Sequence, residues 1–434
     1  MAAARYGGAG MGAVGRGTAG AFGVRAGRIG RRALLAVPLA ALAAAPARAA
    51  PPAGDGAGSR AAAAAGRAGA AARRRAGPVA ELWAIPRPEV VYRMVADGRR
   101  LYVLDPAALT CHDVATGAPV WSVPSVPSQS ERHLAIAADA LAVSVTPNPP
   151  GGGGQGDLAL RDAATGAQRW RLRLDPDVNK IVADPAGLVV GRGYSTGSAT
   201  GHALADGAAR WTHPLPLCGP AAAGAVPVGD PRNTLLLDVA TGERRWRIRP
   251  GRFGVLATSP DGAWWTGYGD ADGTPPAARR VDGATGRTRW RRPEKLWAAA
   301  DDGTVVVGLA FGEGLYGFAP DDGATRWHLP GIGGASNSGS LALAAGLVWT
   351  STATGFALTD AGTGAALDPP ATVAWPVTTL LDAGGVAVLL DRTHLRAFRR
   401  TDAPPASADA PPGSPASAPP GAPADGGAPT RRPA

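Results

Sequence analysis

Hydrophobic residues occur between positions 80 and 400 in short runs that alternate with polar residues and are separated by Gly, Asp and Pro. This spacing is typical of β-strands, which have a period of two residues, and not of the longer 3.6-residue period of a helix. The abundance of Gly (62) and Pro (41) also argues against helices, because neither residue is tolerated in a helix interior. Two example units have expected strands at 90–95, 101–104, 109–113 and 118–123, and at 296–299, 304–309, 315–318 and 325–329.

A nine-residue pattern, Asp-x-x-Thr-Gly-x-x-x-Trp, leads into the last strand of each unit. Its four complete copies are Asp113, Thr116, Gly117 and Trp121; Asp162, Thr165, Gly166 and Trp170; Asp238, Thr241, Gly242 and Trp246; and Asp282, Thr285, Gly286 and Trp290. Shortened or altered copies end at Trp211 (after Asp206-Gly207), Trp327 (after Asp322-Gly323) and Leu367 (after Asp360 and Thr363-Gly364). These endpoints lie 35 to 49 residues apart, which is the period of propeller blades.

The pattern predicts a tight hairpin turn followed by a packing residue. Asp accepts hydrogen bonds from backbone N–H groups of the turn, Thr favours strands, and Gly adopts the positive φ that such turns require. The Trp that follows is large and flat, so it is suited to fill the space between two neighbouring wedge-shaped sheets. We therefore expect these residues to serve packing rather than chemistry.

The two ends of the repeat region complement each other. Residues 373–381, 386–390 and 394–398 supply three expected strands after the last altered copy, and no fourth strand follows them. Residues 81–85 form an expected strand that contains Trp83 but has no partner strands before it. We predict that this first strand completes the last unit, which gives an all-β, eight-bladed β-propeller of four-stranded blades without open sheet edges.

The repeated turn resembles the tryptophan-docking motif of the quinoprotein (PQQ-like) β-propeller superfamily, and the resemblance covers about residues 80–400. That superfamily includes quinone-dependent alcohol and glucose dehydrogenases. It also includes non-enzymatic members, such as the propeller subunit of the outer-membrane β-barrel assembly machinery and extracellular sensor domains. The resemblance thus implies the fold directly but leaves enzyme, scaffold and sensor functions open.

The segments outside the repeats predict export and flexible ends. Residues 1–49 contain Arg31-Arg32, a weakly apolar run at 33–45 and small residues before Ala49, as in a Tat- or Sec-type export signal. Residues 50–79, rich in Ala, Gly and Arg, and residues 401–434, rich in Pro and Ala, are expected to be disordered. No segment is long and apolar enough to predict a transmembrane span in the mature chain.

The basic charge does not predict nucleic-acid binding. The chain has a net charge of +10, but residues 1–80 hold twelve Arg and a single acidic residue, Asp55. The predicted propeller is therefore almost neutral, and a phosphate-binding surface is not expected on it.

Few residues favour an enzyme. The resemblance implies that the dehydrogenases hold pyrroloquinoline quinone (PQQ) beneath a disulfide of two adjacent cysteines, together with Ca²⁺ and an Asp base. This chain has only Cys111 and Cys218, far apart in sequence, and its histidines lack metal-ligand spacing. The Gly-x-Gly-x-x-Gly match at Gly312–Gly317 lies between two expected strands and has no helix after it, so it predicts a hairpin. No catalytic residue, metal or cofactor is expected; PQQ with Ca²⁺ belongs to the dehydrogenase alternative.

Loop lengths predict which face binds a partner. In a propeller the connections between second and third strands share one face with the connections between blades, and the motif turns lie on the other. The longer loops, 146–156, 192–200 and 267–276, all fall on the first face. We expect a recognition surface there, with Arg132, Arg192, Tyr194 and Tyr268 as candidate contacts. The favoured function is a non-catalytic, extracytoplasmic scaffold for a protein or cell-envelope partner; a PQQ-dependent dehydrogenase and a small-ligand sensor are the alternatives.

Overall fold

A computed structural model describes most of the chain after residue 78. The described residues are 79–86, 91–125, 132–145, 156–174, 178–193, 197–230, 233–248, 254–259, 261–267, 278–310, 312–332, 340–352, 355–374 and 376–401. All of them belong to the compact unit that spans Arg60–Ala434. The predicted export signal at 1–49, most of the linker at 50–79 and nearly all of the tail at 401–434 lie outside the described residues.

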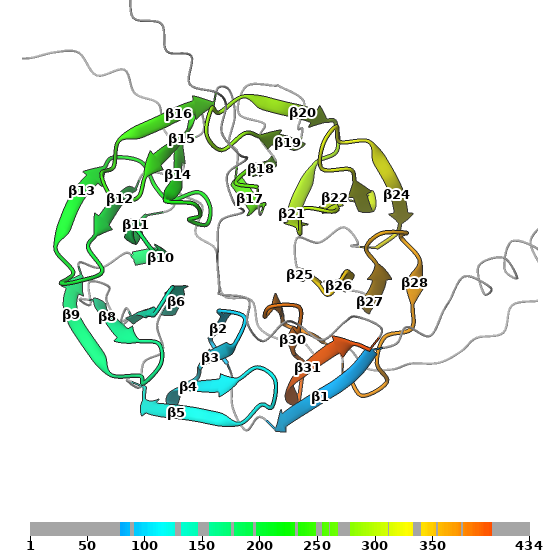
Figure 1. Ribbon diagram of the computed structural model, residues 1–434, viewed down its shortest axis with the longest axis horizontal. Helices are drawn as coiled ribbons and strands as arrows, with labels where there is room; N and C mark the ends of the chain where they lie inside the picture. Colours follow the sequence, from blue (N-terminus) through cyan, green and yellow to red (C-terminus); the bar gives the residue numbers. More distant parts are fainter. Residues whose placement is uncertain are drawn as a thin grey trace, which may run out of the picture. The chain divides into compact units, whose positions relative to one another are not determined.

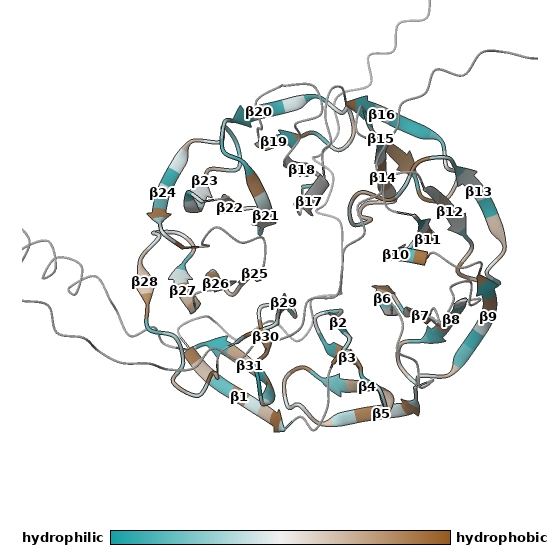
Figure 2. Ribbon diagram, turned by 180° about the vertical axis from the view of Figure 1, so that it is seen from behind, coloured by the Kyte–Doolittle hydropathy of each residue, from teal (hydrophilic) through white to brown (hydrophobic). Residues whose placement is uncertain are grey.

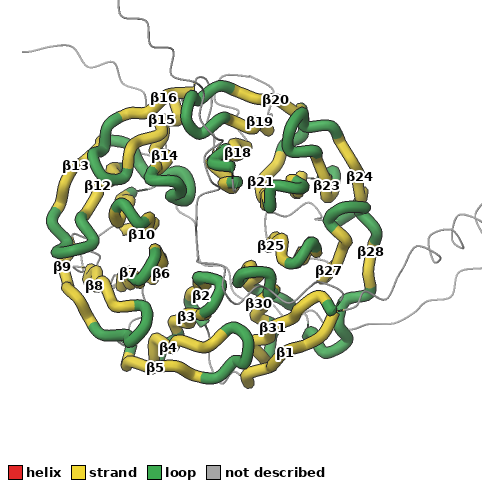
Figure 3. Tube along the Cα trace, in the orientation of Figure 1, coloured by secondary structure: helices red, strands yellow, loops and turns green. Residues whose placement is uncertain are grey.

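The described residues form strands and loops without a helix (Figure 3), so the all-β prediction is confirmed for this part of the chain. No helix that is long and apolar enough to cross a membrane is present there either. The strands assemble into antiparallel sheets, most of them four-stranded and formed from consecutive strands. This arrangement agrees with the repeat of four short runs in the sequence.

The first two sheets are β2 (Arg93–Ala96), β3 (Arg100–Leu104), β4 (Ala108–Asp113) and β5 (Pro119–Pro124); and β6 (Arg132–Ala137), β7 (Ala140–Val145), β8 (Gly156–Asp162) and β9 (Gln168–Leu174). The third and fourth are β10 (Val178–Asp184), β11 (Gly187–Arg192), β12 (Ser198–His202) and β13 (Ala209–His213); and β14 (Ala225–Asp230), β15 (Asn233–Asp238) and β16 (Arg244–Ile248). We call them sheets 1 to 4 in this order.

Sheets 5 and 6 are β17 (Gly254–Thr258), β18 (Trp264–Gly267), β19 (Ala278–Val281) and β20 (Thr288–Arg292); and β21 (Leu296–Asp301), β22 (Val306–Ala310), β23 (Gly314–Phe318) and β24 (Thr325–Pro330). Sheet 7 contains β25 (Ser340–Ala344), β26 (Leu347–Thr352), β27 (Gly355–Asp360) and β28 (Ala366–Leu367). Sheet 8 contains β29 (Thr379–Asp382), β30 (Ala387–Leu390), β31 (His394–Arg400) and, from the start of the described chain, β1 (Val79–Pro86).

Strand β1 pairs antiparallel with β31, with Trp83 opposite Ala397. Figure 1 shows the two strands side by side, β1 in blue and β31 in orange-red, although they are more than 300 residues apart in sequence. Sheet 8 is therefore built from both ends of the repeat region.

Sheet 4 has three strands, which differs from the prediction of four strands in every unit. Residues 215–222, where a first strand would lie, make only isolated bridges, Leu217 to Val228 and Ala222 to Ala225. Pro214 directly precedes this segment, and Pro216 and Pro220 lie within it. Because proline has no N–H to donate to a strand ladder, a continuous first strand is not formed here.

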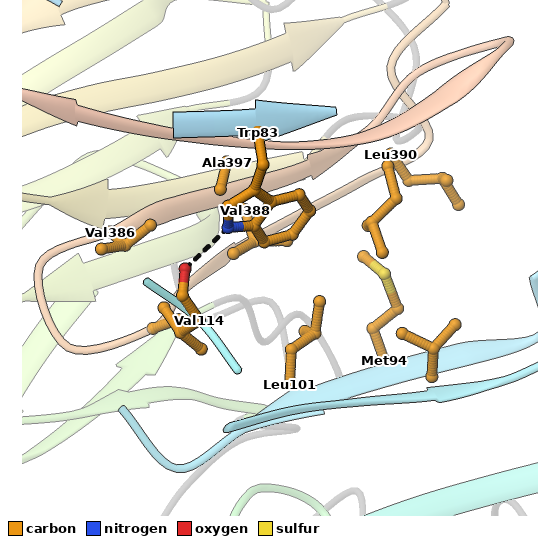
Figure 4. Packing of buried hydrophobic residues seen from close by; sticks show 11 residues of the cluster. Trp83, Met94, Leu101, Val114, Val386, Val388, Leu390 and Ala397 are labelled. Carbon is orange, nitrogen blue, oxygen red and sulfur yellow. Dashed lines mark hydrogen bonds between the residues drawn. The ribbon is translucent and has the colours of Figure 1, made fainter. Parts of the chain in front are cut away.

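Buried residues lie between neighbouring sheets, as alternating side chains along the strands require. One cluster joins sheet 8 to sheet 1, with Trp83, Val388 and Leu390 packed against Met94 and Leu101 (Figure 4). The fourth strands are more polar, and β9, β16 and β20 are mostly hydrophilic in Figure 2. The tryptophan of each of these strands is less exposed than the residues on either side of it. The core is thus divided into layers between sheets.

Candidate functional site

The turn before each fourth strand has one repeated geometry. In sheet 1, Asp113 Oδ1 accepts hydrogen bonds from the backbone N–H of Thr116 (2.9 Å) and from its hydroxyl (2.8 Å), and Gly117 N–H donates to the Asp113 carbonyl (2.8 Å). Gly117 has a φ of +72°, a conformation that favours glycine. The same Asp–Thr hydrogen bonds occur at Asp162 and Thr165, Asp238 and Thr241, Asp282 and Thr285, and Asp360 and Thr363.

Sheets 3 and 6 use a variant of this turn that sequence reasoning described as shortened. The turn has full length, because Gly207 N–H donates to the Ala203 carbonyl and Gly323 N–H to the Ala319 carbonyl, as in the complete copies. Alanine replaces the first Asp, and Asp206 or Asp322 takes the place of Thr. The carboxylate then accepts the N–H of the residue two positions later, at 2.9 Å in Asp206 and 2.8 Å in Asp322. The description as shortened was therefore wrong.

Each motif tryptophan reaches the turn of the next sheet. Trp83 Nε1 donates to the carbonyl of Val114, the residue that follows Asp113, at 2.8 Å (Figure 4). The equivalent donors and acceptors, all between 2.8 and 3.1 Å, are Trp121 to Ala163, Trp170 to Leu204, Trp211 to Val239, Trp246 to Gly283, Trp290 to Pro320 and Trp327 to Ala361. Each indole lies against the turn glycine, where a Cβ on Gly117 would come within 2.8 Å of Trp83.

Arginine precedes the tryptophan in five units, a feature that the sequence reading did not use. Arg169, Arg210, Arg289 and Arg326 hydrogen-bond to the turn between the first and second strands of their own sheet. Arg245 hydrogen-bonds to Ala223, in the segment directly before β14 of sheet 4. Three of them, Arg169, Arg245 and Arg289, also pair with the turn aspartate of that sheet. These contacts tie both turns of a sheet together at the same edge.

The pKa values of the turn carboxyls reflect these contacts. The hydrogen bond from Arg169, followed by that from Thr165, lowers the pKa of Asp162 to about 2. Arg289 and Thr285 lower the pKa of Asp282 to about 2 in the same way. Because hydrogen bonds to the charged form favour it, these aspartates are ionised at neutral pH and occupied by structural partners. They are poor candidates for an acid or base.

Of the four candidate recognition residues, the structure describes the side chain of one. Arg132 begins β6 and Arg192 ends β11, so both backbone positions lie at the strand ends opposite the motif turns. The half-buried side chain of Arg192 is described, whereas that of Arg132 is not. Tyr194, Tyr268 and most of the three long loops lie outside the described residues. The structure thus places the backbones of Arg132 and Arg192 at the same edge of their sheets.

A pocket opens between sheets 1 and 2. Its apolar lining includes Leu104, Leu109, Val123, Pro124, Val143 and Val145. Its polar lining comes mainly from β8 and β9, through Asp157, Arg161, Gln168 and Arg171, together with Ser125 after β5. Val145 and Asp157 of the lining flank the predicted loop at 146–156, so the pocket extends to the edge opposite the motif turns. No sequence pattern indicates this pocket, because it depends on how two sheets meet.

The cysteines and histidines have local surroundings. Cys111 is buried and Cys218 is half-buried, and neither forms a disulfide among the described residues. Burial raises the pKa of Cys111 to about 11. His112 Nδ1 and His202 Nδ1 each lie within hydrogen-bond distance of a turn glycine carbonyl, Gly117 at 3.1 Å and Gly207 at 2.9 Å. Burial lowers the pKa of His202 and of His213. In the described part of the chain, no group of three His, Cys, Asp or Glu side chains is placed to hold a metal ion.

Comparison with known proteins identifies relatives at the level of the family and the fold. A family model described as outer membrane protein assembly factor BamB matches residues 105–222 and 156–403. No curated protein sequence matches the chain.

Three solved structures are similar over most of the described chain. BamB from Moraxella catarrhalis is 14% identical, with a TM-score of 0.55 over 75% of this chain and 98% of that one. The computationally designed Ika8 protein is 14% identical (TM-score 0.56, 73% and 98%), and the C-terminal WD40 domain of Sif2 is 9% identical (TM-score 0.55, 75% and 99%). Since WD40 repeats build β-propellers, these likenesses show a propeller fold.

Proposed function

The chain belongs to the family of the outer membrane protein assembly factor BamB, and from this premise we propose that it is a non-catalytic, extracytoplasmic scaffold that binds a protein partner. The proposal assigns residues 80–400 to the propeller, 1–49 to a Tat- or Sec-type export signal, and 50–79 and 401–434 to flexible segments. Assembly at the outer membrane is the context that the family suggests, with a protein or cell-envelope component as the partner.

We propose further that the sheets are eight blades of one ring, which β1 closes. Eight buried clusters support this arrangement, because each joins residues of two consecutive sheets. One of these clusters joins sheet 7 to sheet 8, and another joins sheet 8 to sheet 1. The contacts of β2 with both β29 and β6 support the same order. A closed ring is a rigid platform on which loops can be displayed.

The observation that carries the scaffold proposal is the difference between the two edges of the sheets. At the edge that carries the motif turns, which we call the motif edge, Asp, Thr, Gly, Trp and Arg are used in turns and in contacts between sheets. At the opposite edge, which we call the loop edge, the strands end in longer connections. These connections are free to vary without loss of the contacts at the motif edge. We therefore place the partner at the loop edge, with Arg132, Arg192, Tyr194 and Tyr268 as its contacts.

Site-specific photo-cross-linking in cells that express the full chain tests this assignment. A photoreactive residue is placed at Arg132, Arg192, Tyr194 or Tyr268, and matched controls carry it at exposed motif-edge positions such as Arg244 and Arg287. The proposal expects one discrete protein adduct from the loop-edge positions and none from the controls. Adducts from the motif edge alone, or from neither edge, contradict it.

The dehydrogenase alternative requires a quinone site, and the residues do not fit one of the kind that the resemblance implies. Cys111 lies in β4 and Cys218 in the segment before β14, so the two cannot form a disulfide between adjacent residues. We derive no catalytic step from PQQ. Incubation of the protein with PQQ, Ca²⁺ and alcohols or sugars tests this point, because the scaffold proposal expects no reduction of an artificial electron acceptor.

A further inference from the structure

The pocket between sheets 1 and 2 combines an aliphatic lining with a cluster of basic groups. Sheet 1 contributes Leu104, Leu109 and Val123, and sheet 2 contributes Val143 and Val145. Among the described residues, no aromatic side chain lines it. Burial of apolar surface in such a pocket favours a ligand with an aliphatic portion, at about 25 cal/mol per Å² removed from water.

The basic groups of the pocket outnumber its carboxylates. Arg171 is paired with Asp157 through two hydrogen bonds, Nε to Oδ1 at 3.1 Å and Nη2 to Oδ2 at 2.6 Å. Arg161 donates from Nη1 to the Gly166 carbonyl at 2.9 Å, and no carboxylate pairs with it within the described residues. Burial, together with the charge of Arg171, lowers the pKa of Arg161. The pocket therefore carries excess positive charge that an anionic group would balance.

One further polar group in the lining lacks a partner. The hydroxyl of Ser125 is buried, and among the described residues it has no hydrogen bond. A buried hydroxyl without a partner is destabilising, so a ligand oxygen that accepts a hydrogen bond from it would be stabilising. The lining thus offers two kinds of donor, a guanidinium and a hydroxyl.

The walls also limit the form of the ligand. They are faces of paired strands, β4 with β5 and β8 with β9, whose backbone groups hydrogen-bond within their own ladders. A peptide chain placed between them would leave its own amides without partners, which is costly. A ligand with a single polar end and an apolar chain avoids this cost.

We propose that this pocket binds an aliphatic carboxylate, with the carboxylate facing Arg161 and the chain lying against the aliphatic lining. The site goes beyond the scaffold function, because it takes a small molecule rather than a protein. The two proposals can fail separately, since the titration below does not depend on recovery of any protein partner.

The repeat provides substitutions that the fold already accepts. In sheet 4, Leu235 and Leu237 occupy the positions equivalent to Ala159 and Arg161, since each lies the same number of residues before the motif aspartate. Both strands pair in the same register with an arginine that follows the tryptophan, Ala159 with Arg171 and Leu235 with Arg247. Ala159→Leu should therefore fill the pocket, and Arg161→Leu should remove its unpaired charge, without loss of the fold.

Isothermal titration of the full chain with sodium octanoate tests the proposal, with 1-octanol and octylamine as probes that lack the carboxylate. We expect saturable binding of one octanoate per chain, with at least tenfold weaker binding of the other two. Both Ala159→Leu and Arg161→Leu should weaken octanoate binding at least tenfold. The matched control is Thr200→Leu, at the equivalent position of sheet 3, which should leave binding unchanged.

Three outcomes would overturn the proposal: no saturable binding of octanoate, equal binding of octylamine, or unchanged binding by Arg161→Leu. If a peptide with a C-terminal leucine binds to the protein and octanoate does not, the pocket would be assigned to a protein C-terminus instead. This result would also refute the proposal of an aliphatic carboxylate ligand. Thermal unfolding verifies that each variant is folded; if Ala159→Leu is not, Arg161→Leu decides alone.

Discussion

The junctions between sheets are of two kinds. In the described chain, seven motif tryptophans each donate a hydrogen bond to the next sheet, from sheet 8 to sheet 1 and onwards to sheet 7. At the junction from sheet 7 to sheet 8, Leu367 stands at the ladder position of the tryptophan, opposite Leu358. The register shift that accompanies the turn in sheets 1 to 6 does not occur there.

Other contacts hold the junction that lacks an indole. Trp349 of β26 packs against Phe398 of β31, with ring centroids 5.5 Å apart. Ser351 Oγ donates to the Val377 carbonyl at 2.6 Å, and Arg400 Nη1 lies 3.0 Å from Asp360 Oδ2. Comparison of the indole junctions with the junction of sheets 7 and 8 indicates that a junction requires buried apolar volume and a polar link between sheets. Different residues can supply them.

Removal of an indole should have the largest effect on stability. Trp246 is 7% exposed and donates to the Gly283 carbonyl at 2.8 Å. We expect Trp246→Ala to lower the free energy of unfolding by about 3–5 kcal/mol, because it leaves a cavity between two sheets. Leu367→Ala, at a half-buried side chain, should cost only about 1 kcal/mol. Urea denaturation measures both, and equal losses would show that the two kinds of junction do not differ.

The turn glycine beneath the indole should rank next. Gly286 has a φ of +71°, and a Cβ there would come within 2.6 Å of Trp246. We expect Gly286→Ala to cost about 2–4 kcal/mol, from backbone strain and overpacking together. Gly262→Ala is the matched control, because Gly262 has a φ of +74° and nothing within 4 Å of its Cβ position. It should cost about 1–2 kcal/mol, and a similar loss in both variants would exclude a role for the indole contact.

Sequence reasoning was most successful where the signal is local. The alternation of short runs and the Asp–Thr–Gly turns are properties of consecutive residues, so strands and turns could be predicted from them. The variant turns of sheets 3 and 6 were misread because Ala203 and Ala319 replace the aspartate that marks the pattern. The missing first strand of sheet 4 could have been expected from Pro214, Pro216 and Pro220.

Features that depend on tertiary contacts could not be predicted. Arg169 and its partner Asp139 are 30 residues apart, and no local pattern connects them. The pocket likewise arises where sheet 1 meets sheet 2, so neither sequence segment indicates it alone. The prediction of the recognition surface rests on loop length, and of its four candidate residues the structure places Arg192 and the backbone of Arg132.

Sheet 8 should lose stability in acid through the carboxylate of Asp391. Arg396 joins its strands, with Nε 2.8 Å from Asp391 Oδ2 and Nη1 3.0 Å from Glu81 Oε1 of β1. Burial alone would raise the pKa of Asp391, but hydrogen bonds from Arg396 and from backbone N–H groups lower it to about 2. A lowered pKa means that the ionised carboxylate stabilises the fold above about pH 4, the ordinary value, and that this contribution is lost as the pH falls towards 2.

Comparison of the wild type with Asp391→Asn isolates that contribution from the acid response of Asp162 and Asp282. We expect the variant to be about 2 kcal/mol less stable at pH 7, and the difference to shrink as the pH falls below 4. Urea denaturation at a series of pH values measures the difference. A gap that stays constant from pH 5 to pH 2.5 would mean that the carboxylate of Asp391 has no special role.

The ion pair at the junction that lacks an indole should have the smallest effect. The side chains of Arg400 and Asp360 are 25% and 19% exposed, so solvent weakens their attraction only in part. Asp360 also accepts hydrogen bonds from Thr363 within its turn, so a single substitution of Asp360 would mix two effects. A double-mutant cycle with Arg400→Gln and Asp360→Asn separates them. We expect a coupling of about 0.5–1 kcal/mol that falls as salt is added. A coupling of zero at low salt would mean that the ion pair does not contribute, and that the packing of Trp349 on Phe398 and the hydrogen bond of Ser351 hold this junction.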